Sequence, residues 1–213
     1  MALTSRSVEE LDEVARECER AGSPATYVAP CDLSDGAAVE RLAQDLVSTF
    51  GGVEVLVNNA GILVNGNPLE GDPDEWEHMM DVIVNAPMRL TRRLAPKMAE
   101  RMSGFVINIG SIAGTEAMSG AAAAYAAAKA GLRGWSRSAY LTLRHKNVKC
   151  VLINPGFVNT DMVTSRPALV GQLIPERMIQ PSDIADAVSF VLNSSPGCVP
   201  EEMNLRLGLS AFK

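Results

Sequence analysis

The stretch Val53-Glu54-Val55-Leu56-Val57-Asn58-Asn59-Ala60-Gly61 decides the fold class of this chain of 213 residues. Its first five residues form a short, largely apolar run, which is typical of a strand buried on both faces of a parallel sheet. A polar, glycine-containing turn follows directly. Ligands bind at the carboxyl ends of the strands in such sheets. The stretch therefore predicts a parallel strand whose end borders a binding site.

Strand-like runs alternate with amphipathic helical stretches along the rest of the chain. The expected strands are 25–30, 105–109, 148–153 and a last one near 203–207. The expected helices are 7–20, 35–50, 74–101, 121–144 and 182–192. This alternation predicts a single α/β domain over residues 1–213, with helices on both faces of a parallel sheet.

Charge and composition argue against several function classes. The net charge of −6 disfavours non-specific binding to nucleic acid, which requires a basic face. His78 and His145 lie far apart and lack metal-ligand spacing, so no metal site is expected. Four scattered cysteines form no Cys-x-x-Cys pair, and no apolar run approaches the ~20 residues of a membrane span. We therefore expect a cytoplasmic protein with no membrane partner.

A second informative feature is Tyr125-Ala-Ala-Ala-Lys129, with Ser111 upstream at the end of a predicted strand. Tyrosine and lysine four residues apart on a helix share one face. An ammonium group there lowers the pKa of the phenol, which could then exchange a proton with a substrate oxygen near neutral pH. Ser111 could donate a hydrogen bond to the same oxygen. Taken alone, such a pair more often belongs to a solvated helix face.

Other strand ends strengthen the case for a site. The turn Asn154-Pro155-Gly156-Phe157-Val158-Asn159-Thr160 follows the strand at 148–153, as Asn58–Gly61 follows the strand at 53–57. Asp32 ends the strand at 25–30, where its carboxylate could meet an adenine amino group. Because the carboxyl ends of parallel strands meet at one edge, we expect all these turns to lie on the same edge of the sheet.

This ordered set of motifs resembles the short-chain dehydrogenase/reductase family over the whole chain. The matching motifs are Cys31-Asp32-Leu33, Asn58-Asn59-Ala60-Gly61, Ile107-Asn108-Ile109-Gly110-Ser111, Tyr125-x-x-x-Lys129 and Pro155-Gly156-Phe157-Val158-x-Thr160. The resemblance implies a three-layer α/β/α Rossmann-type fold with a doubly wound parallel sheet. It also implies a nicotinamide cofactor and a small-molecule carbonyl or alcohol substrate.

The resemblance also assigns roles to individual residues. It makes Tyr125 the catalytic acid/base, with Lys129 lowering its pKa and holding the nicotinamide ribose, and Ser111 the group that polarises the substrate carbonyl. The remaining positions that match cofactor-binding residues are Asp32 and Leu33 near the adenine, Asn58, Ala60 and Gly61 on the adenosine side, and Pro155, Gly156, Val158 and Thr160 near the nicotinamide.

The choice between NADP and NAD depends on the end of the family's second strand. An acidic residue there holds the ribose hydroxyls of NAD and repels a 2′-phosphate. In this chain that end falls at Leu3-Thr4-Ser5-Arg6, which has no acid and offers Arg6 to the phosphate. We therefore expect NADP, with NAD as the alternative and a plain surface arginine as the other interpretation of Arg6.

Two features depart from the family pattern. Little more than Met1-Ala2-Leu3-Thr4 precedes the cap of the first predicted helix, and no glycine occurs before Arg20, so the family's first strand and glycine-rich loop are expected to be missing. That strand is central in the family's sheet, so its loss should leave two inner strands with unpaired edges.

The second departure is Ile83, which stands where the family has a catalytic asparagine. Asn85 is two residues away and could replace that asparagine only through a local kink, and Pro87 is expected to bend this helix.

Three functions remain open at this point. The first is an NADP-dependent carbonyl reductase or alcohol dehydrogenase. The second is a catalytically impaired chain that acts as a structural partner in an oligomer, since the family pairs subunits, as homodimers or homotetramers, through the long helices, here 74–101 and 121–144. The third is epimerase or dehydratase chemistry, which the short C-terminus disfavours. The mostly apolar segment 161–179 suggests a small or moderately apolar carbonyl substrate.

Overall fold

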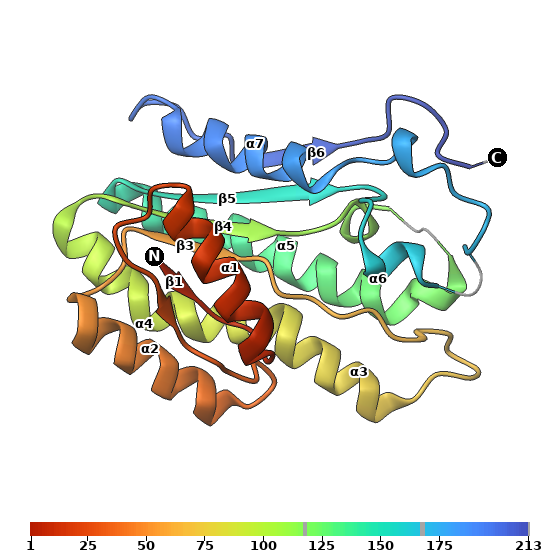
Figure 1. The fold of residues 1–213 in the computed structure, drawn as a ribbon, viewed down its shortest axis with the longest axis horizontal. Helices are drawn as coiled ribbons and strands as arrows, with labels where there is room; N and C mark the ends of the chain where they lie inside the picture. Colours follow the sequence, from red (N-terminus) through yellow and green to blue (C-terminus); the bar gives the residue numbers. More distant parts are fainter. Residues whose placement is uncertain (117–118, 167–168, 213) are drawn as a thin grey trace.

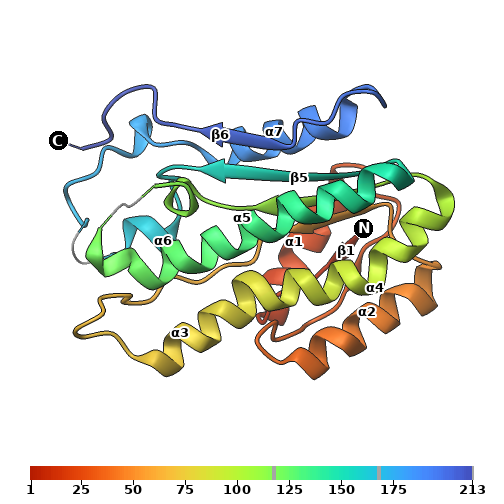
Figure 2. The same ribbon diagram turned by 180° about the vertical axis from the view of Figure 1, so that it is seen from behind.

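The computed structural model describes residues 1–116, 119–166 and 169–212. Parallel strands form the central layer: β1 (Ala2–Leu3), β2 (Tyr27–Val28), β3 (Val55–Asn58), β4 (Gly104–Ile109), β5 (Val148–Pro155) and β6 (Glu202–Leu205). Helices α1 (Val8–Arg20) and α7 (Pro181–Asn193) lie on one face (Figure 1). Helices α2 (Gly36–Phe50), α4 (Ala86–Arg101) and α5 (Ala123–Leu143) lie on the other (Figure 2). The predicted three-layer α/β/α Rossmann-type arrangement is confirmed.

Side-chain caps fix where the first two helices begin. The Ser7 hydroxyl accepts a hydrogen bond from the Glu10 backbone N–H at 3.3 Å, as the capping-box pattern predicts for α1. The Asp35 carboxylate accepts from the first amides of α2, at 2.8 and 3.1 Å. Gly51 ends α2 with a φ of 71°, a left-handed conformation that glycine adopts without strain.

The strands divide into two sheets. β1 pairs with β2, while β3, β4, β5 and β6 form a separate four-stranded sheet in that order. In the part of the chain that the structure describes, one edge of β3 therefore has no strand partner, as the family resemblance predicts for this chain. One apolar cluster bridges the two sheets, since Tyr27 of β2 and Leu56 of β3 both pack against the core between α2 and α4.

The opposite face of β3 differs from the sequence prediction. Val55 and Val57 keep 37% and 42% of their surface exposed, so the prediction that this strand is buried on both faces is wrong. Alternate residues of a strand point to opposite faces, and Leu56, between the two valines, packs on the other face against the core of α2 and α4. This sheet face therefore carries two exposed valines beside an open edge.

The long helix predicted over 74–101 is interrupted. It consists of α3 (Pro73–Met80), a π-helical turn over Asp81–Asn85, and α4. Pro87 has no backbone N–H to donate to the carbonyl of Ile83, so the helix cannot keep its regular bonding at this point. The backbone N–H of Ala86 bonds instead to the carbonyl of Asp81, five residues back. The predicted irregularity is thus a π-turn that precedes the proline.

Candidate active site

Three turns meet at the carboxyl edge of the four-stranded sheet, as the sequence predicts. They follow β3 at Asn58, β4 at Gly110 and β5 at Pro155. The strands are parallel and in close register, with Asn58 opposite Asn108 and Pro155 opposite Leu205. Their ends therefore lie at one edge. Asp32 follows β2 and belongs to the separate two-stranded sheet.

Ser111 is positioned by a short turn directly after β4. It caps the 3₁₀ turn Ile112–Gly114, and its hydroxyl accepts a hydrogen bond from the Ala113 N–H at 3.2 Å. Gly114 lets this turn pack on the backbone of α5, since a Cβ added there would lie 2.7 Å from the carbonyl carbon of Lys129. The close approach of these two backbones brings Ser111 next to the helix that carries Tyr125 and Lys129.

Lys129 lies at the centre of the site. Its ammonium nitrogen donates a hydrogen bond to the carbonyl of Ile109 at 2.8 Å and lies 5.7 Å from the centroid of the Tyr125 ring. A Cβ added to Gly61 would come within 3.8 Å of the same nitrogen. Lys129 is buried, with 4% of its surface exposed. The i, i+4 spacing therefore does place both side chains on one face, as predicted, and that face is the inner one rather than a solvated one.

Burial shifts both pKa values away from the charged forms. It lowers the pKa of Lys129 to about 8. Burial also raises the pKa of Tyr125, and this effect exceeds the lowering by the neighbouring Ser111 hydroxyl and by the charge of Arg166. The prediction that Lys129 brings the Tyr125 pKa below its ordinary value is wrong. The ammonium group faces the ring and bonds to Ile109, so it does little for the phenolic oxygen.

The lowered pKa of Lys129 predicts a pH-dependent stability. Between about pH 8 and 10.5 the unfolded chain holds a proton on this lysine that the folded chain has lost, so the free energy of unfolding rises with pH. Relative to Lys129→Met, the wild type should gain about 3 kcal/mol across this window. Urea denaturation of both proteins at about pH 7 and pH 10 measures the difference. A gap that stays constant with pH would contradict the buried ammonium.

A buried polar chain supports the turn after β3. The Asn58 side-chain amide donates to the Oδ1 of Asn108 at 2.8 Å, and the Asn108 amide donates to the Ser136 hydroxyl at 3.1 Å. All three side chains are buried. Asn58 is therefore fixed to β4 and α5, a link that we did not predict. The signal was present, since Asn108 interrupts an otherwise apolar strand and a buried amide needs partners.

Asn85 does not replace the asparagine that the family resemblance requires. Its side chain is exposed and donates to the Asp81 carboxylate at 2.7 Å, on the outer face of the π-turn. Ile83 is fully buried and packs with Met79, Leu132 and Leu152 behind the site. The π-turn therefore supplies a local irregularity without turning Asn85 inward.

Of the remaining predicted cofactor positions, those in the turns after β3 and β5 lie along the same edge. Gly61, Gly156 and Val158 are partly buried, and Val158 bridges to Ile179; Ala60 and Thr160 are exposed. The pKa of the Asp32 carboxyl is lowered mainly by hydrogen bonds from Ser34. The positive charge of Arg6 makes a smaller contribution to the same lowering. Leu33 packs into the core between α2 and α4.

These residues fit the nicotinamide half of a dinucleotide. The Lys129 ammonium has three donor positions and one of them is used by Ile109, which leaves donors for ribose hydroxyls. The turn after β5 is open, since a Cβ added to Gly156 would make only ordinary contacts at 3.4 Å or more. The fit is weaker for the pyrophosphate, because helix α1 carries Glu9 and Glu10 in its first turn and its N-terminus would repel an anion.

The predicted substrate segment 161–179 forms an apolar wall beside this edge. Leu173 and Met178 pack with Ala211, and Phe157, Val163 and Leu169 pack against that cluster. A short helix, α6 (Asp161–Thr164), stands in this segment, where no helix was predicted. Residues 167–168 of the segment lie outside the described residues. An exposed ion pair joins Arg206, the residue after β6, to Glu116, which lies five residues after Ser111; the two side chains are 2.8 Å apart.

The described residues offer neither a membrane-spanning helix nor a metal-binding cluster. None of their helices has the length and apolar character that crossing a bilayer would require. Within the same ranges, no three histidine, cysteine, aspartate or glutamate side chains gather closely enough to hold a metal ion.

Known proteins match this chain along most of its length. A family model for the short chain dehydrogenases matches residues 1–169. Nodulation protein G of Azospirillum brasilense is 32% identical over 190 residues, covering 86% of this chain and 77% of that protein. The 3-oxoacyl-[acyl-carrier-protein] reductase FabG of Vibrio cholerae is 31% identical over 176 residues, covering 80% of this chain and 72% of that protein.

Solved structures agree with this assignment. A metagenomic short-chain oxidoreductase in complex with NADP superposes with a TM-score of 0.80 at 34% identity, covering 98% of this chain and 86% of its own. The closed form of a serine dehydrogenase complexed with NADP+ superposes with a TM-score of 0.83 at 26% identity, covering 96% and 83%. Motifs, fold and relatives agree, and the chain belongs to the short-chain dehydrogenase/reductase family of NAD(P)-dependent oxidoreductases.

Proposed function

We propose that this chain interconverts a carbonyl and an alcohol by hydride transfer with NADP(H), and that Tyr125 is the acid/base. The observation that carries the proposal is the convergence of Ser111, Tyr125 and Lys129 at one end of β4. The Ser111 hydroxyl is close enough to Tyr125 to lower its pKa, and Lys129 lies against the same ring. A substrate oxygen placed between the two hydroxyls would be in reach of both.

The roles of the three side chains follow from their environments. When bound, the nicotinamide supplies or accepts the hydride. Ser111 holds the substrate oxygen by a hydrogen bond that strengthens as negative charge develops on it. Tyr125 donates its proton to that oxygen during reduction and removes it during oxidation. The raised pKa keeps Tyr125 protonated before reduction, and the hydrogen bond from the Ser111 hydroxyl stabilises the phenolate that remains afterwards.

NADP is the proposed cofactor, with NAD less favoured. Arg6 is exposed at the end of β1, and no acidic residue stands within the Leu3–Arg6 segment to repel a 2′-phosphate. Two of the superposed structures carry NADP or NADP+, according to their descriptions. The substrate would be a small or moderately apolar carbonyl compound, because the wall formed by the described part of segment 161–179 is apolar.

A fluorescence titration with NADPH and NADH tests this proposal. We expect NADPH to bind more tightly, and Arg6→Glu to weaken NADPH by about tenfold while changing NADH little, because one charge-assisted bond to phosphate is replaced by repulsion. Arg16→Glu, an exposed charge change on α1, is the matched control. No binding of either cofactor at millimolar concentration by a folded sample would refute the enzyme proposal for this chain.

A second candidate function has an observation in its favour. The open edge of β3 and its exposed valines weaken the part of the fold next to the adenosine side of the site. The chain could therefore act as a catalytically impaired structural partner in a cytoplasmic homodimer or homotetramer assembled through the long helices. Cofactor binding separates the two functions, since the structural partner needs none.

A further inference from the structure

Arg166 differs from the other charged side chains in the segment that follows the turn after β5. It is half-buried, and its backbone is held in place because its carbonyl accepts hydrogen bonds from the N–H groups of Leu169 and Val170, at 2.8 and 3.0 Å. The other charged residues in the described part of segment 161–179 are exposed: Asp161, Glu176 and Arg177. Arg166 is therefore the charged group of this segment that is drawn into the protein.

Arg166 lies close to the proposed acid/base. It follows α6 by two residues, and α6 lies at the end of α5 that carries Tyr125 (Figures 1 and 2). Its positive charge acts on the Tyr125 phenol and favours the phenolate form, which lowers the pKa of that group. A molecule bound to Arg166 would therefore lie beside the group that exchanges the proton.

Arg166 has no acidic partner among the residues that the structure describes. Glu116 follows the Ser111 turn and could otherwise reach the site, but it pairs with Arg206 at 2.8 Å. A half-buried guanidinium has lost part of its hydration, and an anion would compensate that loss. The geometry thus leaves a positive charge near Tyr125 that the described part of the protein does not neutralise.

We propose that Arg166 binds a carboxylate of the substrate, so that the chain reduces small oxo acids rather than neutral ketones or aldehydes. The planar guanidinium can donate two parallel hydrogen bonds to the two carboxylate oxygens, while the carbonyl oxygen lies between Ser111 and Tyr125. One unpaired arginine balances one negative charge, which suits a carboxylate better than a phosphate dianion. This inference rests on the proposed reductase function and names its substrate class.

The apolar surroundings of Arg166 favour the same assignment. Leu169, three residues further on, packs against the cluster of Leu173, Met178 and Ala211. Water is sparse beside such a wall, so an ion pair there is screened less than one on the open surface. The wall would contact the short carbon chain of the acid. The carboxylate keeps its charge throughout, while the carbonyl carbon gains the hydride of NADPH and the carbonyl oxygen gains the Tyr125 proton.

Acetoacetate and acetoacetamide test the proposal, because they have nearly equal size and differ in the charge of one end. In an assay of NADPH oxidation, the wild type should show a kcat/KM about 10- to 100-fold higher for acetoacetate, as expected for a charge-assisted hydrogen bond. Arg166→Met should remove this preference by lowering the value for acetoacetate alone. Arg166→Lys should keep part of it, since the charge remains without the planar fork. Pyruvate and pyruvamide repeat the comparison with a shorter acid.

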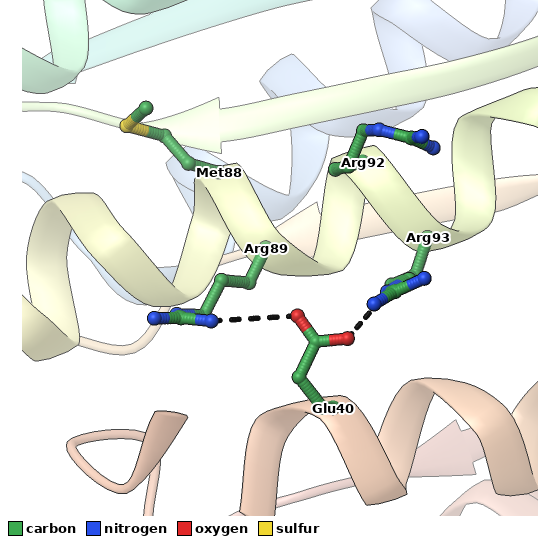
Figure 3. A pocket seen from close by; sticks show the side chains of 5 residues that line it. All are labelled: Glu40, Met88, Arg89, Arg92 and Arg93. Atoms are coloured by element: carbon green, nitrogen blue, oxygen red, sulfur yellow. Dashed lines mark hydrogen bonds and ion pairs between the residues drawn. The ribbon is translucent and has the colours of Figure 1, made fainter. Parts of the chain in front are cut away.

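Arg92→Met is the matched control. Arg92 lines a surface hollow of about 300 Å³ between α2 and α4, and it is exposed. Figure 3 shows that it points away from Glu40, which pairs with Arg89 and Arg93. It is thus a second arginine without an acidic partner among the described residues, but it lies outside the site. Its loss should leave the preference for acetoacetate at the wild-type level.

Two results would overturn the proposal. One is a wild type that reduces acid and amide equally well. The other is an equal loss for both substrates in Arg166→Met, which would mean that Arg166 acts on the Tyr125 phenolate instead. If the wild type reduces no substrate, saturation-transfer NMR of 3-hydroxybutyrate and 3-hydroxybutyramide, with and without NADP+, replaces the rates. Binding of the acid alone, lost in Arg166→Met, would support the carboxylate site while the reductase function fails, and equal or absent binding would refute it.

Discussion

Replacing Tyr125 with phenylalanine is expected to lower carbonyl-reductase turnover by a factor of about 10² to 10⁴, because the substrate oxygen then has no positioned proton donor. The phenolic hydroxyl is the only atom removed, and the ring that Lys129 contacts stays in place. Affinity for NADPH and the thermal unfolding midpoint should therefore remain close to those of the wild type.

Tyr140 provides the matched control. It lies on the same helix, contacts Arg144 through its ring, and stands away from Ser111 and Lys129. Tyr140→Phe should keep wild-type turnover in the same assay of NADPH oxidation. If Tyr125→Phe retains most of the activity, another group supplies the proton and the proposed role of Tyr125 is wrong.

Replacing Gly110 with alanine is expected to lower the free energy of unfolding by about 2–4 kcal/mol, through steric overlap and lost hydrogen bonds. A Cβ at this position would lie 2.2 Å from the Oδ1 of Asn154. Asn154 cannot move aside cheaply, because it is buried and its amide donates to Glu202 at 2.9 Å and to Asn204 at 3.0 Å. The overlap would also displace Ser111, the next residue, so activity should fall as well.

Gly156→Ala is the control for this stability prediction. Gly156 occupies the turn after the neighbouring strand β5, and a Cβ there would meet its nearest atom at 3.4 Å. The substitution should change the free energy of unfolding by less than about 1 kcal/mol. Urea denaturation of both variants compares them directly. Equal stabilities would mean that Asn154 relaxes and that the crowding at Gly110 is not a constraint.

Much of the fold could be predicted because it depends on local patterns. The alternation of apolar runs with amphipathic stretches gave the parallel sheet and its helix layers, and the Ser7 and Asp35 caps located two helix starts within a residue. The resemblance to the family anticipated the unpaired strand edges, since it predicted two inner strands without a partner. The burial of β3 on both faces was mispredicted, because burial depends on what covers a strand rather than on its own residues.

The site was predictable to a similar extent. Ser111, Tyr125 and Lys129 could be named because strand ends and i, i+4 spacing fix where side chains lie relative to the backbone. The pKa of Tyr125 could not be predicted, because its direction depends on how much protein surrounds the phenol and on which way the Lys129 ammonium points. The link from Asn58 through Asn108 to Ser136 joins residues far apart in sequence, so only the folded chain reveals it.

The sequence by itself determined the fold class, the family and the identity of the proton-transfer residues, because these follow from local periodicity and from motifs at strand ends. The tertiary structure decided the division into two sheets, the outward position of Asn85 and the burial of Lys129 beside Ile109. These features depend on which distant segments pack together, and packing, rather than local sequence, sets exposure and charge environment.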